Sequence, residues 1–148
     1  ASDLEPIQLE PITHHDAALV IVATDGTETR YSPSELEQLT TYRIRTTTPW
    51  RPEPADFDGV LLADVLALHG IDQVDAILVT AENDYRTTFK REVWENVNVM
   101  LATRVDDQPH NRRARGPIQF VIAASEFSQA SYLSESHFVW MAARIEPQ

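Results

Sequence analysis

Apolar residues along the chain gather in short runs that polar turns separate, and this pattern predicts a protein made mainly of short strands. The run "AALVIVAT" has the length of one strand, and Asp25-Gly26 after it supplies the positive φ angles that a two-residue hairpin turn requires. "TETRYS" then predicts the second strand of that hairpin. Six later segments also predict strands, namely residues 41–47, 74–81, 84–90, 98–105, 118–124 and 137–146.

Two segments carry clear helix signals. Ser32 can act as an N-cap, Pro33 suits the first helical position and Glu35 completes a capping box, which predicts that a short helix begins there. Within residues 57–70, the apolar positions 61, 62, 65, 66 and 68 form a helical stripe. Gly70 is placed to end this main core helix in a left-handed conformation.

Two polar segments interrupt the pattern. Three prolines in "PWRPEPAD", residues 49–56, remove hydrogen-bond donors and fix φ, which predicts an exposed loop. "DDQPHNRRARGP", residues 106–117, predicts a polar loop rich in arginine, while 91–97 predict one helical turn and 125–133 a short helix or turn. Because strands predominate and the helices do not alternate regularly with them, the predicted fold class is α+β, with a mixed, mainly-β sheet and two or three short helices.

Composition narrows the class of protein. The 148 residues suit one compact domain, which we divide into an extended leader over residues 1–18 and a domain over residues 19–148. The formal charge of -11, from 23 acidic and 12 basic residues, argues against a nucleic-acid partner, because phosphate binding requires a basic face. No apolar run reaches the roughly 18 residues that a membrane span requires, so we expect no membrane-spanning segment. Zero cysteines exclude disulfides, thiolate metal sites and cysteine nucleophiles.

The opening residues "ASDLEP" lack an initiating methionine, as in a mature protein whose signal peptide has been removed. The absence of cysteine is compatible with a bacterial periplasm. We therefore expect a periplasmic or secreted location.

Six stretches follow one another along the chain: "RTTTPW", "FDGVLLADVLALHG", "AENDYRTTF", "VMLATRVDDQP", "RGPIQFVIA" and "HFVWMAARIE". In this order they resemble the molybdopterin-binding domain of the sulfite oxidase superfamily, and more closely its small, secreted, single-domain bacterial relatives. The resemblance runs from about Leu19 to Glu146. It implies a sulfite oxidase-type molybdopterin-binding fold, whose full-length catalytic members bind a pterin-coordinated molybdenum and perform oxygen-atom transfer.

The resemblance also implies where a metal would be held. Catalytic members carry Arg-Cys in the positions of Arg45 and Thr46, and that cysteine thiolate ligates the molybdenum. A threonine hydroxyl stays protonated near neutral pH and is a hard, weak donor, unlike the soft thiolate. We therefore expect no catalytic residue, no metal ligand and no cofactor, with molybdopterin implied by the resemblance alone.

A candidate ligand cleft lies where "YRIRTTTPW" and "ENDY" would meet. Its candidate residues are Arg45, Thr46, Trp50, Asn83 and Tyr85. Trp50 would form an aromatic wall for a ligand, or else a plug over the core. Asn83 and Tyr85 would offer amide and hydroxyl groups to a ligand, or else Asn83 would bond its own backbone in a turn.

Arginines concentrate in the polar loop, where Arg112, Arg113 and Arg115 follow Arg104. They could bind an anion through bidentate hydrogen bonds, or they could form a solvated face that pairs with the surplus acids. We hypothesise that Arg113 and Arg115 flank the same cleft as Arg45 and form its anion-recognising edge.

Other reactive residue types give weaker signals. His14-His15-Asp16 could bind a divalent metal, but adjacent side chains diverge in a strand or loop. His137 begins an apolar run, where a structural histidine is expected. Hydrolase chemistry is disfavoured because no serine in the following set lies in a G-x-S-x-G motif: Ser125, Ser128, Ser131, Ser134 and Ser136.

Two functions stay open at this point. The first is a non-catalytic periplasmic binding or interaction module on the resembled fold, which takes a small anionic molecule or a protein partner. The alternative is a molybdopterin-dependent oxidoreductase that performs oxygen-atom or electron transfer without cysteine ligation.

Overall fold

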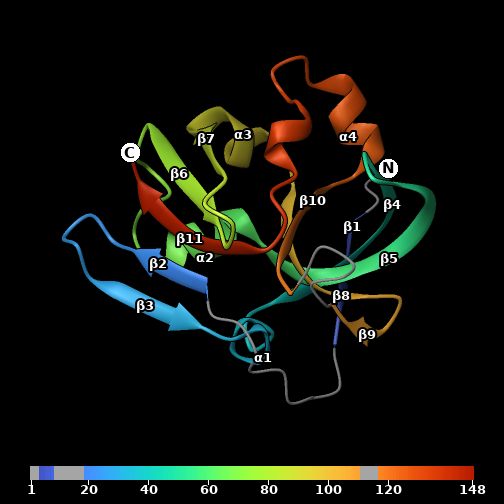
Figure 1. The fold of residues 1–148 in the computed structure, drawn as a ribbon, viewed down its shortest axis with the longest axis horizontal. Coiled ribbons are helices and arrows are strands. Elements are labelled where there is room, and N and C mark those ends of the chain that lie inside the picture. Colours follow the sequence, from blue (N-terminus) through green and yellow to red (C-terminus); the bar gives the residue numbers. More distant parts are fainter. Residues whose placement is uncertain (1–3, 9–18, 111–116) are drawn as a thin grey trace.

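The computed structural model describes residues 4–8, 19–110 and 117–148 of the chain, and within these residues the strands form two sheets (Figure 1). The first sheet contains, in spatial order, β1 (Leu4–Ile7), β4 (Thr41–Thr48), β5 (Arg51–Leu61), β8 (Val99–Val105) and β10 (Gln119–Ile122), and β9 (Gln108–Pro109) pairs with β8. The second sheet contains, in spatial order, β3 (Glu28–Tyr31), β2 (Leu19–Val22), β11 (Ala142–Pro147), β6 (Ala76–Ala81) and β7 (Arg86–Lys90).

The helices are short and connect strands. In the described part of the chain they are α1 (Pro33–Leu36), α2 (Leu62–Leu68), α3 (Arg91–Asn96), α4 (Ala124–Gln129) and the 3-10 helix η2 (Glu135–His137). The α+β class, with mostly strands and few helices, is confirmed, although there are four α-helices rather than two or three. None of them is long and apolar enough to cross a membrane.

The predicted helix signals are confirmed at atomic level. Ser32 Oγ accepts a hydrogen bond from the Glu35 N–H at 3.2 Å, and Glu35 Oε1 accepts one from the Ser32 N–H at 3.0 Å, which is the reciprocal pattern of a capping box. Further along, Gly70 has a φ of 69° after the end of α2, as its left-handed role requires.

The first hairpin is confirmed, but its turn differs from the prediction. β2 pairs with β3 in antiparallel register, from Leu19 opposite Tyr31. Gly26 has a φ of 88°, whereas Asp25 does not have a positive φ. Hydrogen bonds from Gly26 N–H to the Ala23 carbonyl and from Ala23 N–H to the Thr27 carbonyl, both 2.9 Å, close a three-residue loop. A left-handed glycine at its last position is the usual solution for such a loop.

The exposed loop predicted over residues 49–56 is wrong for most of its length. Only Pro49 and Trp50 form the turn, and β5 begins at Arg51. Prolines are tolerated in a strand where no ladder hydrogen bond is required of them. The register shifts between Thr46 and Thr48, which leaves residues 52–54 outside the ladder and exposed.

The last predicted strand, residues 137–146, is also wrong in its first half, because β11 begins only at Ala142. The preceding residues belong to neither sheet, since His137 ends η2 and Met141 has a φ of 55°. The Val139 carbonyl accepts a hydrogen bond from the Phe120 N–H at 2.7 Å, and the Met141 carbonyl accepts one from the Glu82 N–H at 2.8 Å. This segment therefore connects β10 of the first sheet with the end of β6 in the second.

Two apolar clusters share strands β8 and β10 of the first sheet. Val99 and Leu101 of β8 belong to the larger cluster, which also contains buried residues of the second sheet and of α2. Met100 and Ala102, the alternate residues, belong to a smaller cluster enclosed by the first sheet with Ile44. Because strand side chains alternate between faces, β8 is buried on both sides, as its continuous apolar run predicts.

The first sheet curls around this smaller cluster. β1 pairs only with residues 41–44 of β4, so part of the segment before residue 19 belongs to the sheet. Beyond Ile44, the open edge of β4 faces the end of β10, where the Ala124 N–H donates a hydrogen bond to Thr46 Oγ1 at 2.9 Å. This side-chain bond ties the two ends of the curled sheet together.

Two arginines neutralise buried carboxylates beside the curl. Arg43 donates two hydrogen bonds to the fully buried Asp58, at 2.8 and 3.0 Å, and one to Asp107 at 2.8 Å. Burial raises the pKa of Asp58, and the Arg43 guanidinium opposes that effect. Arg104 makes a second bidentate pair with Glu37 at 2.9 and 2.8 Å. Loss of one partner from a buried pair costs about 3–5 kcal/mol, so these pairs are structural.

Gly59 of β5 yields a stability prediction, because a Cβ at this position would collide with the backbone carbonyl of Leu101 on β8. Backbone atoms of a central strand cannot move aside, so Gly59→Ala should destabilise the fold by about 3 kcal/mol or more. In a domain of this size that corresponds to a fall of about 10 °C in melting temperature. The matched control is Gly26→Ala, where the added methyl meets open space and only the positive φ costs about 1 kcal/mol. Equal melting temperatures for the two variants would contradict the close approach of β5 to β8.

Candidate functional site

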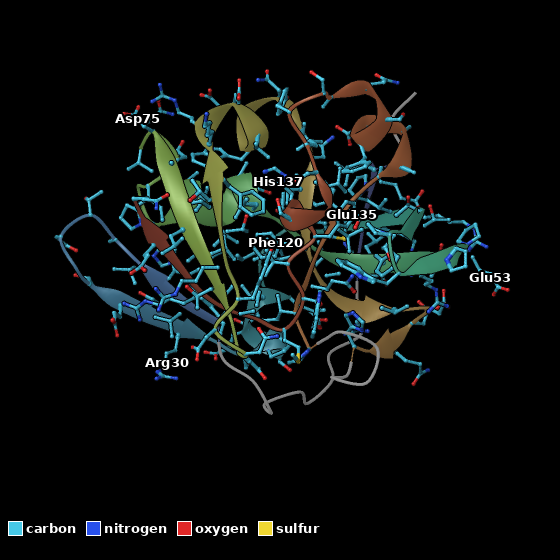
Figure 2. The ribbon with its side chains drawn as sticks, turned by 45° about the horizontal axis from the view of Figure 1, so that its top comes forward. Arg30, Glu53, Asp75, Phe120, Glu135 and His137 are labelled. Carbon is cyan, nitrogen blue, oxygen red and sulfur yellow. The ribbon has the colours of Figure 1, made fainter. Side chains whose placement is uncertain are left out.

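An aromatic hollow with a cavity volume of about 310 Å³ lies between the ends of several loops. Four aromatic side chains line it, namely Trp50, Tyr85, Phe138 and Trp140. Its polar lining consists of Asn83, Glu135 and Ser136. These residues come from the β4–β5 turn, the β6–β7 turn, and the segment from η2 to Trp140. Figure 2 labels Glu135 and His137, the first and last residues of η2.

The walls of the aromatic hollow are held by specific contacts. The rings of Trp50 and Phe138 are arranged edge to face, with centroids 6.3 Å apart and planes at 80°. The Tyr85 hydroxyl donates to the Ser136 carbonyl at 3.4 Å, which joins the β6–β7 turn to η2. Asn83 Oδ1 accepts the Tyr85 N–H at 3.2 Å, which fixes the turn through the asparagine side chain.

A second, smaller hollow of about 240 Å³ adjoins the first, and Glu135 and Phe138 line both. The remainder of its lining comes from Thr47, Thr48, Pro49, Ala124 and Phe127. We call it the threonine hollow. The rings of Phe138 and Phe127 lie 5.3 Å apart, so Phe138 stands between the two hollows with an aromatic ring on either side.

Thr46 lies behind the threonine hollow rather than in it. Its side chain is only 5% exposed, and its hydroxyl donates to the Thr47 carbonyl at 3.1 Å while it accepts the Ala124 N–H at 2.9 Å. Ala124 opens α4, and the first N–H groups of a helix have no partner within it. Ala123 at the N-cap makes no side-chain cap bond, so Thr46 performs part of that role from another strand.

The residues around Thr46 do not fit the thiolate-held metal that the resemblance implies. The neutral hydroxyl is a hard donor, and both of its hydrogen bonds are structural. Of the described residues that line the two hollows, Glu135 is the one charged group, so no base there would pair with an anionic cofactor. Within residues 4–8, 19–110 and 117–148, no group of three or more His, Asp or Glu side chains is arranged to hold a metal ion.

The structure brings Trp50, Asn83 and Tyr85 together, as the candidate cleft requires, but it does not bring Arg45 to them. Arg45 is the neighbour of Thr46 on a strand, so its side chain faces the opposite side of β4. It is 64% exposed there and pairs with Asp56 at 3.2 Å. The ring of Trp50 lines the hollow and also packs against the buried Phe138.

The anion-recognising edge expected at Arg113 and Arg115 stays a prediction. Arg104, the first member of the group, is buried and bonded to Glu37. Arg112, Arg113 and Arg115 lie outside the described residues, as do His14, His15 and Asp16.

The structural interpretation of His137 agrees with its surroundings. His137 ends η2 and is buried, with its ring edge to face on Phe89 at 4.8 Å. Its Nδ1 accepts the Ser134 N–H at 3.1 Å, and burial lowers the pKa of the imidazole. Ser134 and Ser136 share a hydroxyl–hydroxyl hydrogen bond of 2.6 Å.

Sequence reasoning missed four residues of the aromatic hollow as site residues, namely Glu135, Ser136, Phe138 and Trp140. The stretch "HFVW" predicts the beginning of a strand, which would place Phe138 and Trp140 on one face of a sheet. The available signal was the polar "SES" before it, which favours a break rather than a continuous strand.

Comparisons with known proteins give a likeness in fold. No protein-family model matches the chain, and no curated protein matches it. Among solved structures, the chain is similar to the sulfane dehydrogenase SoxCD from Paracoccus pantotrophus, with a TM-score of 0.70 and 13% identity over 95% of this chain and 40% of that chain. The chain thus spans less than half the length of that enzyme chain. The likeness shows that this chain and part of the SoxCD chain share a fold.

The Thr46 hydroxyl generates a second prediction. Thr46→Val keeps the shape of the side chain but leaves the Ala124 N–H without its acceptor, so the free energy of unfolding should fall by about 1–3 kcal/mol. Thr46→Ser should stay near wild type, and Thr46→Cys should lie between them because a thiol is a weak acceptor. Thr48→Val, a change on the same strand, should alter stability by no more than about 0.5 kcal/mol. Chemical denaturation checks these values, and a Thr46→Val variant as stable as Thr48→Val would refute the role of this bond.

The buried imidazole generates a third prediction. The folded-state pKa of His137 lies below its unfolded value of about 6.5, so its neutral form stabilises the fold fully above that pH. This contribution is lost as the pH falls from about 6.5 toward the folded pKa, because the unfolded chain takes up the proton first. Melting temperature should therefore decrease less on acidification in His137→Gln than in wild type. His69, whose pKa is also lowered by burial, is present in both proteins, so parallel pH profiles would contradict the assignment to His137.

Proposed function

We propose that the chain is a non-catalytic periplasmic binding module whose ligand site is the aromatic hollow. The observation that carries this proposal is the convergence of four aromatic and three polar side chains, from three separate segments, around one cavity. Ligand sites are usually concave, mainly apolar and supplied with a few polar groups that fix the ligand. The volume of about 310 Å³ lies at the lower end of the range for such sites, roughly 300–1,000 Å³, which suits a small molecule.

Exposed aromatic surface supports the same site. Among the described residues, the large apolar side chains that stay exposed are Trp50, Leu68, Tyr85 and Tyr132. Trp50 and Tyr85, at 36% and 45% exposure, both border the aromatic hollow. Apolar surface left open at one place marks a site where something binds, whereas scattered single residues carry no such meaning.

The chemistry at position 46 supports binding rather than redox catalysis. Thr46 holds the sheet and α4 together, and its hydroxyl is committed to those bonds. The sulfane dehydrogenase activity is that of SoxCD, and a likeness at 13% identity extends to the fold alone. The alternative function, a molybdopterin-dependent oxidoreductase without cysteine ligation, has the fold likeness in its favour.

Tryptophan fluorescence tests the proposed site. Trp50 and Trp140 line the hollow, whereas Trp94 is buried and donates to the Asp72 carbonyl at 3.0 Å. A bound small molecule should therefore change the emission of wild type and of Trp94→Phe, and the change should shrink in Trp50→Phe and Trp140→Phe. A chemically diverse set of small molecules is titrated into all four proteins. The absence of any ligand whose signal depends on Trp50 or Trp140 would refute the site.

Metal analysis separates the two functions. Protein purified from a host that makes molybdenum cofactor should contain far less than one molybdenum atom per chain. Stoichiometric molybdenum, with the absorption spectrum of a bound pterin, would overturn the binding module and favour the oxidoreductase.

A further inference from the structure

The composition of the aromatic hollow points to the class of its ligand. From its rings and its single charge, we propose that it binds a small organic cation, a methylated or quaternary ammonium compound. This inference rests on the proposed function, since it names the ligand of the same site.

Aromatic rings are the first argument. The faces of Trp, Tyr and Phe carry negative partial charge and attract a cation within about 6 Å, most strongly for Trp. Two of the four rings that line the hollow are tryptophans, Trp50 and Trp140. The planes of Trp50 and Phe138 meet at 80°, so they form two differently oriented walls, and Tyr85 adds a third ring from the opposite turn. Rings that surround a cavity in different orientations are the arrangement that recognises alkylated ammonium groups.

Charge is the second argument. Glu135 contributes a carboxylate to the hollow, and the other described lining groups are neutral. Arg45 and Arg104, which could have offset this charge, are paired with Asp56 and Glu37 away from the hollow. An anion would therefore meet a carboxylate and π faces with no compensating base among these residues. A cation would meet complementary charge, and the net charge of -11 raises the local concentration of cations further.

Hydrogen-bond capacity is the third argument. Among the polar groups of the hollow, Glu135 is acceptor-only when ionised. Asn83 Oδ1 and the Ser136 carbonyl are already engaged by the Tyr85 N–H and hydroxyl. The site therefore has few free groups to match the many hydroxyls of a sugar, and it suits a compact cation that needs few directional bonds.

The test compares choline and tetramethylammonium with 3,3-dimethyl-1-butanol, the neutral isostere of choline, and with acetate and phosphate as anions. Binding is measured by tryptophan fluorescence and calorimetry at low ionic strength. Choline should bind about tenfold or more tightly than its isostere, because only the charge differs. Acetate and phosphate should give no signal.

Two variants and two matched controls locate the site. Trp50→Leu should weaken choline binding about tenfold, and Glu135→Gln about fivefold, with thermal melting used to show that both still fold. Tyr132→Leu removes an exposed aromatic ring outside the hollow, and Glu53→Gln removes an exposed carboxylate far from Glu135 (Figure 2). Both controls should bind choline as wild type does.

The outcomes distinguish this inference from the proposed function. If choline and its neutral isostere bind equally well and both signals are lost in Trp50→Leu, the ligand is not selected for positive charge. That result would refute the proposed ligand class and leave the hollow as a binding site. Binding of acetate or phosphate in preference to choline would do the same. Choline binding unchanged in both Trp50→Leu and Glu135→Gln would overturn the inference by placing the cation elsewhere. If no compound gives a Trp50-dependent signal, the proposed function fails together with the ligand class.

Discussion

The fold depends on burial of both faces of β8 and β10. Val99 and Leu101 face the second sheet, while Met100 and Ala102 face the inside of the curled first sheet. A strand that is apolar on both faces needs a layer on each side, and one flat sheet cannot supply two layers. The chain solves this by curling the first sheet and packing the second against it, which brings the β4–β5 and β6–β7 turns to one rim. The aromatic hollow lies at that rim because the two layers meet there.

Local signals in the sequence predict the elements, whereas long-range pairing decides the architecture. The Ser32 capping box and the end of α2 at Gly70 depend on neighbours a few residues away, and both could be predicted. The division into two sheets could not, because it depends on pairings such as β2 with β11. The role of Thr46 was equally hidden, since its partner Ala124 lies 78 residues further along the chain. Trp50 and Tyr85 were predicted for the site because aromatic residues at turns are visible in sequence, but Glu135 was not.

Among the described residues, several arginines form ion pairs with carboxylates. Arg43 neutralises the buried Asp58 and reaches Asp107, and Arg104 is buried against Glu37. These positive charges stabilise the interior of the fold, which leaves the exposed surface with the surplus of carboxylates.

The position of β11 has a consequence for the order in which the molecule assembles. This strand comes last in the sequence of strands but lies between β2 and β6, in the middle of the second sheet. The early hairpin β2–β3 and the later hairpin β6–β7 can each form from local contacts, but they cannot join until β11 arrives. Contacts between distant segments slow folding, because a long loop must close before they form. Until β11 is synthesised, β2 and β6 each have one edge without a strand partner. Misassembly would begin at these unpaired edges.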